Sequence, residues 1–320
     1  MSQGWDSSIK DELKMVEQEI HRSISSEQPI LTEICDYVIS SGGKRMRPGV
    51  TILSYLASGG KEVSEAIKIA AAFEMIHSAT LIHDDINDRS EMRRGRQSAY
   101  KKFGLQQALV SGDYLFVKAF AIGGFFNEEI VSLVAEACTA IAESEIVQFE
   151  KEGQVASLDV YLGIIEGKTA KPIMAGARIG AYLAKAELDR VHAMGEYGLN
   201  IGMAFQIIDD ILDIEGTEKT LGKPRMVDFD EGKATLPLIH AMADPKVGSR
   251  LLQLFHKKVK TEQDVEEALA LISNTKAIEL SRVKAKEYAD IALQALEGVP
   301  ESEYKQGLRR LAETVVDRKH

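Results

Sequence analysis

Residues 66–83 read AIKIAAAFEMIHSATLIH, and only Lys68 and Glu74 in this run are charged. The apolar positions do not alternate with polar ones, so the run predicts a helix buried nearly all round rather than a half-exposed strand. Residues 196–214 have the same character, because they stay apolar until their last helical turn. Two such helices indicate the centre of an all-α protein.

The segments near both ends of the chain predict outer helices. Residues 11–25 and 277–296 have apolar positions at helical spacing and a charged opposite face. Seven prolines and 25 glycines in 320 residues leave long uninterrupted stretches, and no Pro/Ser-rich linker or internal repeat divides them. We therefore expect a single-domain helical bundle over residues 1–320, in which residues 1–10 form a flexible N-terminal tail.

Composition excludes several classes of protein. The chain has 49 acidic and 39 basic residues and a net charge of -10, so it lacks the broad positive field that nucleic acids require of a partner. Its most apolar stretch, residues 115–126, is too short to cross a membrane. Cys35 and Cys138 are too few for a disulfide framework or a thiolate metal site. We expect a soluble, cytoplasmic protein with reduced cysteines and no integral membrane segment.

Both apolar runs end in an acidic motif of the form DDxxD, at residues 84–88 and 209–213. In a helix the first and last aspartates of such a motif lie one turn apart on one face, where like charges repel each other. A cation must compensate them, and oxygen-only ligands favour Mg²⁺, which is usually held by one or two carboxylates plus substrate phosphates. The motifs therefore predict a magnesium site for a phosphate ester or diphosphate. Its candidate ligands are Asp84, Asp85, Asp88, Asp209, Asp210 and Asp213.

Two other interpretations of these motifs are weaker. A single DDxxD is as typical of a solvated acidic helix end as of a metal site, but two copies on the two most apolar helices disfavour that reading. A ferritin-like di-metal bundle also places carboxylates inside helices, but it requires two Glu-x-x-His motifs. The sequence has one, at residues 74–77.

Basic segments accompany the acidic motifs. Residues 42–48, GGKRMRP, put three cations on a glycine-led turn before a helix, and Arg93 and Arg94 follow the first motif. Alone, each segment is more typical of a solvated surface, but beside two acidic motifs both favour diphosphate binding. Residues 216–237 are polar and rich in glycine and proline, so we expect a mobile functional loop whose closure brings Lys223 and Lys233 onto the diphosphate.

These motifs together resemble the trans-isoprenyl diphosphate synthases, the family of farnesyl, geranylgeranyl and longer polyprenyl diphosphate synthases. The resemblance runs in the family's order and spacing from residue 42 to residue 237. It also includes EMIH at 74–77, GDYL at 112–115, EIVQ at 145–148, KTA at 168–170 and FQIIDDILD at 205–213. Asn87 and the sequence RMV at 225–227 depart from the family's pattern, but neither departure removes a candidate ligand.

The resemblance implies an isoprenoid synthase fold around a deep central cavity, usually in a homodimer, and Mg²⁺-dependent condensation of isopentenyl diphosphate with an allylic diphosphate. The six aspartates of the motifs are then the ligands of a cluster of Mg²⁺ ions at the allylic diphosphate. The residues implied to contact that diphosphate or the metal shell are Arg93, Gln148, Lys168, Gln206, Lys223 and Lys233. The binding of isopentenyl diphosphate falls to Lys44, Arg47, His77 and Arg94.

The family's chemistry is ionisation to an allylic carbocation, attack by the alkene and loss of a proton. It implies that the released diphosphate takes that proton, while Thr169 and Gln206 orient the carbocation. No side-chain general base is expected. By the same resemblance, the helix containing residues 112–126 is the expected homodimer interface.

Product length is tested by the residues about one helical turn before Asp84, because an extended isoprene unit is about as long as one turn. Those residues are Ala79 and Thr80, whereas the resemblance implies an aromatic residue there in short-chain enzymes. We therefore expect a product of about C25 to C40. Geranylgeranyl diphosphate, C20, is the alternative if a deeper aromatic residue closes the cavity. The candidates are Phe73, Phe116 and Phe120.

Two rival functions are less favoured. A class I terpene cyclase has carbocation chemistry and an aspartate-rich motif, but it does not need the basic segments at 42–48 and 93–94 for a second diphosphate. A non-catalytic partner subunit of a heteromeric synthase is expected to have degraded aspartate motifs, and both motifs are intact here.

Overall fold

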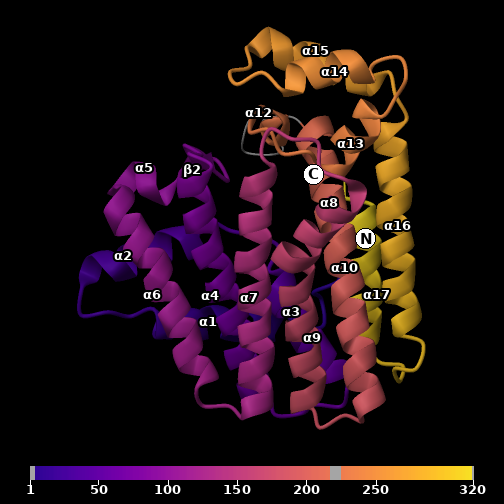
Figure 1. Cartoon of the computed structure of the whole chain (residues 1–320). Coiled ribbons are helices and arrows are strands. Elements are labelled where there is room, and N and C mark those ends of the chain that lie inside the picture. Colours follow the sequence, from indigo (N-terminus) through magenta and orange to yellow (C-terminus); the bar gives the residue numbers. More distant parts are fainter. Residues whose placement is uncertain (1–3, 217–224, 319–320) are drawn as a thin grey trace. The chain divides into compact units, whose positions relative to one another are not determined.

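The computed structural model describes residues 4–216 and 225–318, and the regular secondary structure of these residues is helical apart from one short β-hairpin (Figure 1). The first elements are α1 (Lys10–Ser23), α2 (Pro29–Ile39), α3 (Met46–Ala57), α4 (Ser64–Asn87), β1 (Met92–Arg93), β2 (Arg96–Gln97), α5 (Ala99–Phe103) and α6 (Leu105–Gly123). They are followed by α7 (Glu128–Lys151), α8 (Leu158–Ile165), the π-helix η1 (Glu166–Ala170), α9 (Lys171–Leu183), α10 (Leu188–Glu215), α12 (Val227–Asp230), α13 (Leu236–Met242), α14 (Gly248–Phe255), α15 (Glu262–Ser273), α16 (Ala277–Ala295) and α17 (Glu303–Val316). The all-α prediction is confirmed.

The chain divides into two compact units, each assembled from segments that are separate in the sequence. Unit 1 comprises Met1–Glu136, Pro172–Gly198 and Ala295–Leu311. Unit 2 comprises Ala137–Lys171, Leu199–Gln294 and Ala312–His320. The expected single domain over 1–320 stays a prediction, and each unit is described by itself below.

Helix α4 is the centre of unit 1, as its apolar sequence predicts. It packs most extensively against α6 and also contacts α3 and α1. Residues 69–76 of α4 are buried without interruption, so the helix has no solvated face along this part. The α6 side of the contact depends on Gly112, because a Cβ at this position would collide with the ring of His83. Glycine therefore allows α6 to lie directly on the acidic end of α4.

A second close helix contact in unit 1 joins α3 and α9. A Cβ built on Gly180 of α9 would lie 2.5 Å from the carbonyl oxygen of Thr51 and 3.0 Å from the amide nitrogen of Tyr55. Both neighbours are backbone atoms of α3, which cannot rotate away. The absence of a side chain at Gly180 therefore sets the distance between these helices.

The segment expected to be a flexible tail contributes to the core of unit 1. Within residues 1–10 the structure describes residues 4–10, and the side chains of Trp5 and Ile9 are buried. A Cβ on Gly49 of α3 would lie 2.5 Å from the Trp5 ring, so the indole packs directly on that helix. Hydrophobic burial thus holds this segment in place.

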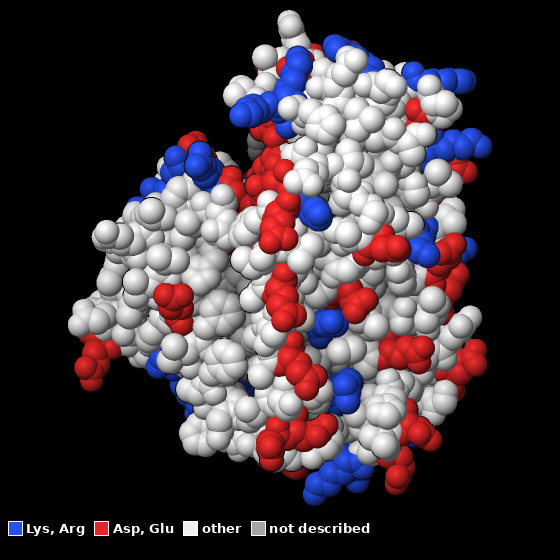
Figure 2. Space-filling view, viewed as in Figure 1, with Lys and Arg blue, Asp and Glu red and all other residues white. Residues whose placement is uncertain are grey.

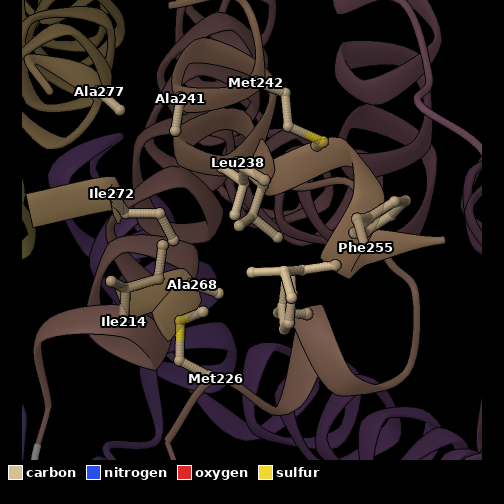
Figure 3. Packing of buried hydrophobic residues seen from close by; sticks show 12 residues of the cluster. Ile214, Met226, Leu238, Ala241, Met242, Phe255, Ala268, Ile272 and Ala277 are labelled. Carbon is tan, nitrogen blue, oxygen red and sulfur yellow. The ribbon is translucent and has the colours of Figure 1, made fainter. Parts of the chain in front are cut away.

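Unit 2 is built around two apolar clusters. One lies beside α10, where Ile207, Ile208 and Ile211 pack with Tyr161 and Ile165. The other gathers side chains from α13, α14 and α15 around the end of α10 (Figure 3). The last third of α10 is therefore mostly buried, as expected from residues 196–214, and two residues of the second acidic motif, Ile211 and Leu212, belong to the first cluster.

Exposed acidic residues follow one side of α7. Glu129, Glu136, Glu143 and Glu150 are all exposed and recur every two helical turns, and Figure 2 shows acidic side chains in a line over this helix.

In the part of the chain that the structure describes, no helix has the length and apolar character needed to cross a membrane.

Gly180→Ala should destabilise the protein, because its Cβ would press on backbone atoms of α3. We expect the free energy of unfolding to fall by about 1 to 3 kcal/mol, the usual effect of overpacking. Gly163→Ala in α8 is the matched control, since nothing lies within 4 Å of its Cβ position and alanine is the better helix former. Urea unfolding of both variants measures the difference, and equal stabilities would contradict the packing argument.

Candidate functional site

The first acidic motif occupies the C-terminal end of α4. Asp85 is buried, and Arg93 donates from Nε to its Oδ1 at 2.6 Å. Asp84 and Asp88 are partly exposed, and the Asp88 amide closes the helix by donating to the Asp84 carbonyl oxygen at 2.8 Å. Burial raises the pKa of Asp85 to about 6, although the Arg93 guanidinium opposes this shift. Asp85 is thus enclosed and bound by Arg93, while Asp84 and Asp88 are partly exposed to solvent.

Arg93 is positioned by a short β-hairpin. β1 pairs with β2 in an antiparallel register that places Arg93 opposite Arg96. The two residues between the strands, Arg94 and Gly95, have φ of 51° and 75°. Two consecutive residues with positive φ are the signature of a tight hairpin turn, which usually has Asn or Asp at its first position. The sequence analysis identified the two arginines but not this hairpin.

The two basic segments of unit 1 lie against each other. Arg94 donates from Nη1 to the carbonyl oxygen of Gly42 and, at 3.3 Å, to Oγ of Ser41. A Cβ on Gly43 would lie 3.0 Å from the Arg94 guanidinium, so glycine admits that group, and φ at Gly43 is 143°. The glycine-led turn and the arginines after the first motif therefore form one basic cluster.

Arg45, the middle cation of the glycine-led turn, points into the protein. It donates from Nη1 to Oε1 of Glu74 at 2.6 Å and from Nη2 to the carbonyl oxygen of Ile39 at 2.9 Å. Glu74 is buried on α4, so this ion pair fixes the turn to the central helix. The neighbouring cations in the sequence, Lys44 and Arg47, are the two that the resemblance connects with a ligand.

His77 of α4 lies in the field of the same basic cluster. Burial lowers the pKa of His77 well below its usual value, and the charges of Arg47, Arg94, Arg93 and Arg45 lower it further. The imidazole is therefore neutral at physiological pH. A neutral ring both donates and accepts a hydrogen bond, whereas an imidazolium would add a charge to four arginines.

The five candidate chain-length residues have different surroundings in unit 1. Ala79 is fully buried, and Thr80 donates from Oγ1 to the carbonyl oxygen of His77 at 2.8 Å. Phe73 is buried and lies close to the Cβ position of Gly176 on α9. Phe116 packs on His83 with ring centroids 6.0 Å apart, and Phe120 is 42% exposed. Of the three aromatic candidates, Phe73 is thus the one enclosed by the core.

The second acidic motif lies near the end of α10 in unit 2. Asp210 is buried, and both its carboxylate oxygens accept hydrogen bonds: from Tyr161 Oη at 2.6 Å and from Gln206 Nε2 at 2.9 Å. Thr169 donates in turn to Oε1 of Gln206 at 2.8 Å. Asp213 is also buried, and its Oδ2 accepts from the amide of Asp228 at 3.2 Å. Asp209 is the exposed aspartate of this motif.

Asp210 is a buried carboxylate in an acidic neighbourhood. Burial raises its pKa well above the usual value, and the nearby carboxylates of Asp228 and Asp209 act in the same direction. The hydrogen bonds from Tyr161 and Gln206 oppose this shift because they stabilise the ionised form. The sequence analysis missed Tyr161. Its signal is weak, namely one hydroxyl in the otherwise apolar sequence VYLGII at 160–165.

Lys168 and Thr169 are carried by the π-helix η1, an irregular turn of a kind that often occurs at functional sites. Lys168 Nζ lies 2.6 Å from Oε2 of Glu145 on α7. A Cβ on Gly167 would collide with Ser144, so glycine allows η1 to approach α7 closely. The π-turn thus turns Lys168 toward α7 and Thr169 toward Gln206 on α10.

The region after residue 224 is tied to the second motif. Met226 donates from its amide to the carbonyl oxygen of Asp213 at 2.8 Å, and Lys233 Nζ lies 2.8 Å from Glu231. Lys223, a predicted diphosphate contact, falls outside the described residues. On α7, the buried Nε2 of Gln148 donates to no acceptor among the residues that the structure describes.

The accessible carboxylates suit a cation that arrives with a ligand. Among the described residues, no three His, Cys, Asp or Glu side chains are grouped closely enough to hold a metal ion by themselves. Asp84, Asp88 and Asp209 offer oxygen atoms only, which is the donor class that Mg²⁺ prefers. Magnesium in proteins commonly uses one or two carboxylates and completes its shell with substrate phosphates and water. The carboxylates of each motif, taken by itself, therefore fit a cation of the Mg²⁺ class that binds together with a phosphate ligand.

A cavity of about 710 Å³ in unit 2 contains none of the predicted site residues. Its wall includes Leu212 and Ile214, which flank Asp213, together with Arg225 and Arg282. Arg282 pairs with Glu215, another lining residue. Because this cavity lacks the predicted site residues, it is not the one expected to hold a growing prenyl chain.

Known proteins match the chain over nearly its whole length. The family model described as polyprenyl synthetase matches residues 28–272. An octaprenyl diphosphate synthase of Haemophilus influenzae is 34% identical over 313 residues, which are 97% of this chain and 94% of that protein. Heptaprenyl diphosphate synthase component 2 of Geobacillus stearothermophilus is 36% identical over 309 residues, 95% of each chain.

Solved structures of related synthases also match the chain over nearly its whole length. The polyprenyl synthase of Caulobacter crescentus CB15, complexed with calcium and isoprenyl diphosphate, superposes with a TM-score of 0.94 at 34% identity and 100% coverage of both chains. A geranylgeranyl pyrophosphate synthetase of Pyrococcus horikoshii superposes with a TM-score of 0.90 at 33% identity and 98% coverage of both chains.

Tyr161→Phe should destabilise the protein, because it leaves a buried oxygen of Asp210 without its hydrogen-bond donor. We expect the free energy of unfolding to fall by about 1 to 3 kcal/mol. Tyr182→Phe is the control, since that hydroxyl contacts Asn127 at an exposed position and its loss should change stability by less than about 0.5 kcal/mol. Urea unfolding compares the two variants, and similar losses would refute the role of the Tyr161 hydroxyl.

His77→Gln tests the neutral imidazole through the pH dependence of stability. The pKa of His77 is lower in the folded than in the unfolded chain, where it is about 6.5. Below pH 6.5 the unfolded wild type therefore binds more protons, and stability is lost as the pH falls. The wild type should lose up to about 1.4 kcal/mol per pH unit more than His77→Gln. Urea unfolding at pH 7.5 and 5.5 measures this, and parallel losses would indicate that folding does not lower the pKa of His77.

Proposed function

Because the chain belongs to the polyprenyl synthetase family, we propose that it is a trans-polyprenyl diphosphate synthase, which condenses isopentenyl diphosphate with an allylic diphosphate. The observation that carries this proposal is the construction of the two aspartate motifs. In each, the first aspartate is accessible while the second is buried and held, by Arg93 in one motif and by Tyr161 and Gln206 in the other. Such pairs suit a diphosphate that brings its own cations.

The allylic diphosphate binds, in this proposal, at the two aspartate motifs. Asp84, Asp88 and Asp209 hold the Mg²⁺ ions, and Asp85, Asp210 and Asp213 hold the motifs in place. Bound Mg²⁺ neutralises the charge that develops on the leaving diphosphate. Support comes from Gln148, whose buried amide nitrogen would gain a phosphate oxygen as acceptor. The other residues proposed to contact this diphosphate are Arg93, Lys168, Lys223 and Lys233.

Isopentenyl diphosphate binds at the basic cluster of unit 1. We assign it to Lys44, Arg47, His77 and Arg94. The close packing of Arg94 on the glycine-led turn and the four arginine charges around His77 support this assignment, because they concentrate positive charge. Arg fits a diphosphate through its planar fork and Lys through its point charge.

Thr169 and Gln206 are proposed to orient the allylic carbocation. Their hydrogen bond, anchored on Asp210, supports a fixed position for both groups. The alkene of isopentenyl diphosphate then attacks, and the released diphosphate takes the proton, so no side chain acts as general base.

The product is proposed to contain about C25 to C40, because small residues stand one turn before the first motif. Octaprenyl and heptaprenyl synthases among the relatives support this length. Geranylgeranyl diphosphate is the alternative, and a geranylgeranyl synthetase among the solved structures supports it. Phe73 is the more plausible floor, since Phe120 is 42% exposed.

A second copy of the chain is proposed to cover α6. Leu109, Val110, Val117 and Phe120 are large apolar side chains exposed on this helix, and burial against an identical helix would remove them from water. A heteromeric enzyme is the competing assembly, because one relative is described as component 2 of a heptaprenyl synthase. A cytoplasmic location stays a prediction from the sequence.

The purified chain should make prenyl diphosphates without a partner. We would incubate it with Mg²⁺, isopentenyl diphosphate and, separately, dimethylallyl, geranyl, farnesyl or geranylgeranyl diphosphate, and size the dephosphorylated products by mass spectrometry. A ladder ending at about C25 to C40 is expected. An end at C20 would indicate a deeper floor, and no product from any primer would indicate an obligate partner or another carbocation reaction.

The matched variants are Asp209→Asn, in the second motif, and Asp290→Asn, an exposed aspartate of α16. Asp209→Asn should reduce turnover by at least about 100-fold, because it removes a charge that holds the metal at the leaving group. Asp290→Asn should leave turnover unchanged. Circular dichroism verifies that both variants fold, and normal turnover in Asp209→Asn would overturn the metal assignment.

A further inference from the structure

Arg318 is seated on the second acidic motif within unit 2. It lies two residues beyond the end of α17 and donates from Nη1 to Oδ1 of Asp209 at 3.1 Å. Its guanidinium carbon also lies 5.3 Å from the ring centroid of Phe205 on α10. The Arg318 side chain is 19% exposed, so it is largely enclosed by these contacts rather than extended into solvent.

The partner of Arg318 is the aspartate of this motif with room for an outside ligand. Both oxygens of Asp210 accept hydrogen bonds from side chains, and Asp213 accepts one from the Asp228 amide. Both of these carboxylates are buried, whereas the Asp209 side chain is 49% exposed. A cation that approaches the motif from solvent therefore meets Asp209 first, and Arg318 is already bound to it.

We propose that Arg318 is a built-in counter-ion of Asp209, which must leave this carboxylate before a divalent cation can bind there. The inference rests on the proposed function, since it takes Asp209 as a metal ligand. A guanidinium and a divalent cation both neutralise the carboxylate, so they compete for it. Arginine stays protonated at any physiological pH, and a change of pH therefore does not relieve the competition.

A diphosphate relieves this competition in two ways. It offers the planar guanidinium fork of Arg318 another anion that can accept two hydrogen bonds, and it carries phosphate oxygens that complete the shell of the incoming cation. The second motif of the substrate-free protein therefore binds divalent cations weakly, and diphosphate and cation bind together. Arg318 makes metal binding at Asp209 conditional on the substrate.

The competing explanation is that Arg318 only fastens the end of α17 to α10. In that case its removal lowers stability and leaves metal affinity unchanged. Unit 2 offers a matched ion pair with no link to the motif. Arg250 donates to both oxygens of Glu267, at 2.7 and 2.8 Å, and both side chains are partly exposed.

The test is a titration of Mn²⁺ followed by electron paramagnetic resonance in wild type, Arg318→Met and Arg250→Met, without diphosphate. We expect Arg318→Met to bind Mn²⁺ about two- to fivefold more tightly than wild type, because a partly exposed competing ion pair is lost. Arg250→Met should match the wild type. With saturating inorganic pyrophosphate, the difference between Arg318→Met and wild type should shrink or vanish.

The decisive comparison is made in a protein that already contains Asp209→Asn. If Arg318 acts through Asp209, adding Arg318→Met to Asp209→Asn should not change Mn²⁺ affinity. Unchanged affinity in folded Arg318→Met, or an equal gain in the Asp209→Asn background, would overturn the proposal. These titrations use no prenyl substrate, so they separate this inference from the proposed function: the absence of prenyl products refutes the function but leaves the Mn²⁺ result standing.

Discussion

The concentration of carboxylates at the ends of two apolar helices is the constraint that the rest of the site satisfies. Within each motif the neighbouring aspartates repel one another, and burial raises the pKa of Asp85 and Asp210. The protein meets this in a repeated way: the second carboxylate of each motif is enclosed and given a donor, Arg93 for Asp85 and Tyr161 with Gln206 for Asp210. The first carboxylate stays accessible. The buried members thus fix the helix ends that present Asp84 and Asp209.

The basic residues of unit 1 also have two roles: some bind other parts of the protein, and others are proposed to bind the ligand. Arg45 forms an ion pair with Glu74 that holds the glycine-led turn on α4, and Arg94 donates a hydrogen bond to the backbone of that turn. Of their sequence neighbours, Lys44 lies on this fixed turn and Arg47 in the first turn of α3, which follows it. Pre-ordered charge of this kind lowers the entropic cost of binding an anion, because fewer side chains must be immobilised on contact. Two glycines permit this order: Gly42 adopts a φ of 88°, and Gly43 leaves room for the Arg94 guanidinium.

Much of this arrangement is predictable from the sequence, and the exceptions have a common cause. Continuous apolar runs identified α4 and α10, amphipathic spacing identified α1 and α16, and the DDxxD repeats located both motifs, because these are local patterns. The hydrogen bond of Tyr161 joins residues 49 positions apart, and the Arg318 contact joins residues 109 apart. The spacing of apolar residues along the sequence does not predict contacts between residues so far apart. The π-turn at Lys168 and the inward role of Arg45 were missed for the same reason, as they depend on which helix packs alongside.

The hydrogen bonds that end on Asp210 also have a direction. While Asp210 is ionised it only accepts, so the Gln206 amide must turn its nitrogen toward Asp210 and its oxygen toward Thr169. The hydroxyl hydrogen of Thr169 is then committed to Gln206. Thr169 consequently shows any other neighbour only lone pairs. A carboxylate two hydrogen bonds away thus orients a neutral hydroxyl. The Thr169 oxygen then stabilises a nearby positive charge and cannot donate to a further hydrogen-bond acceptor.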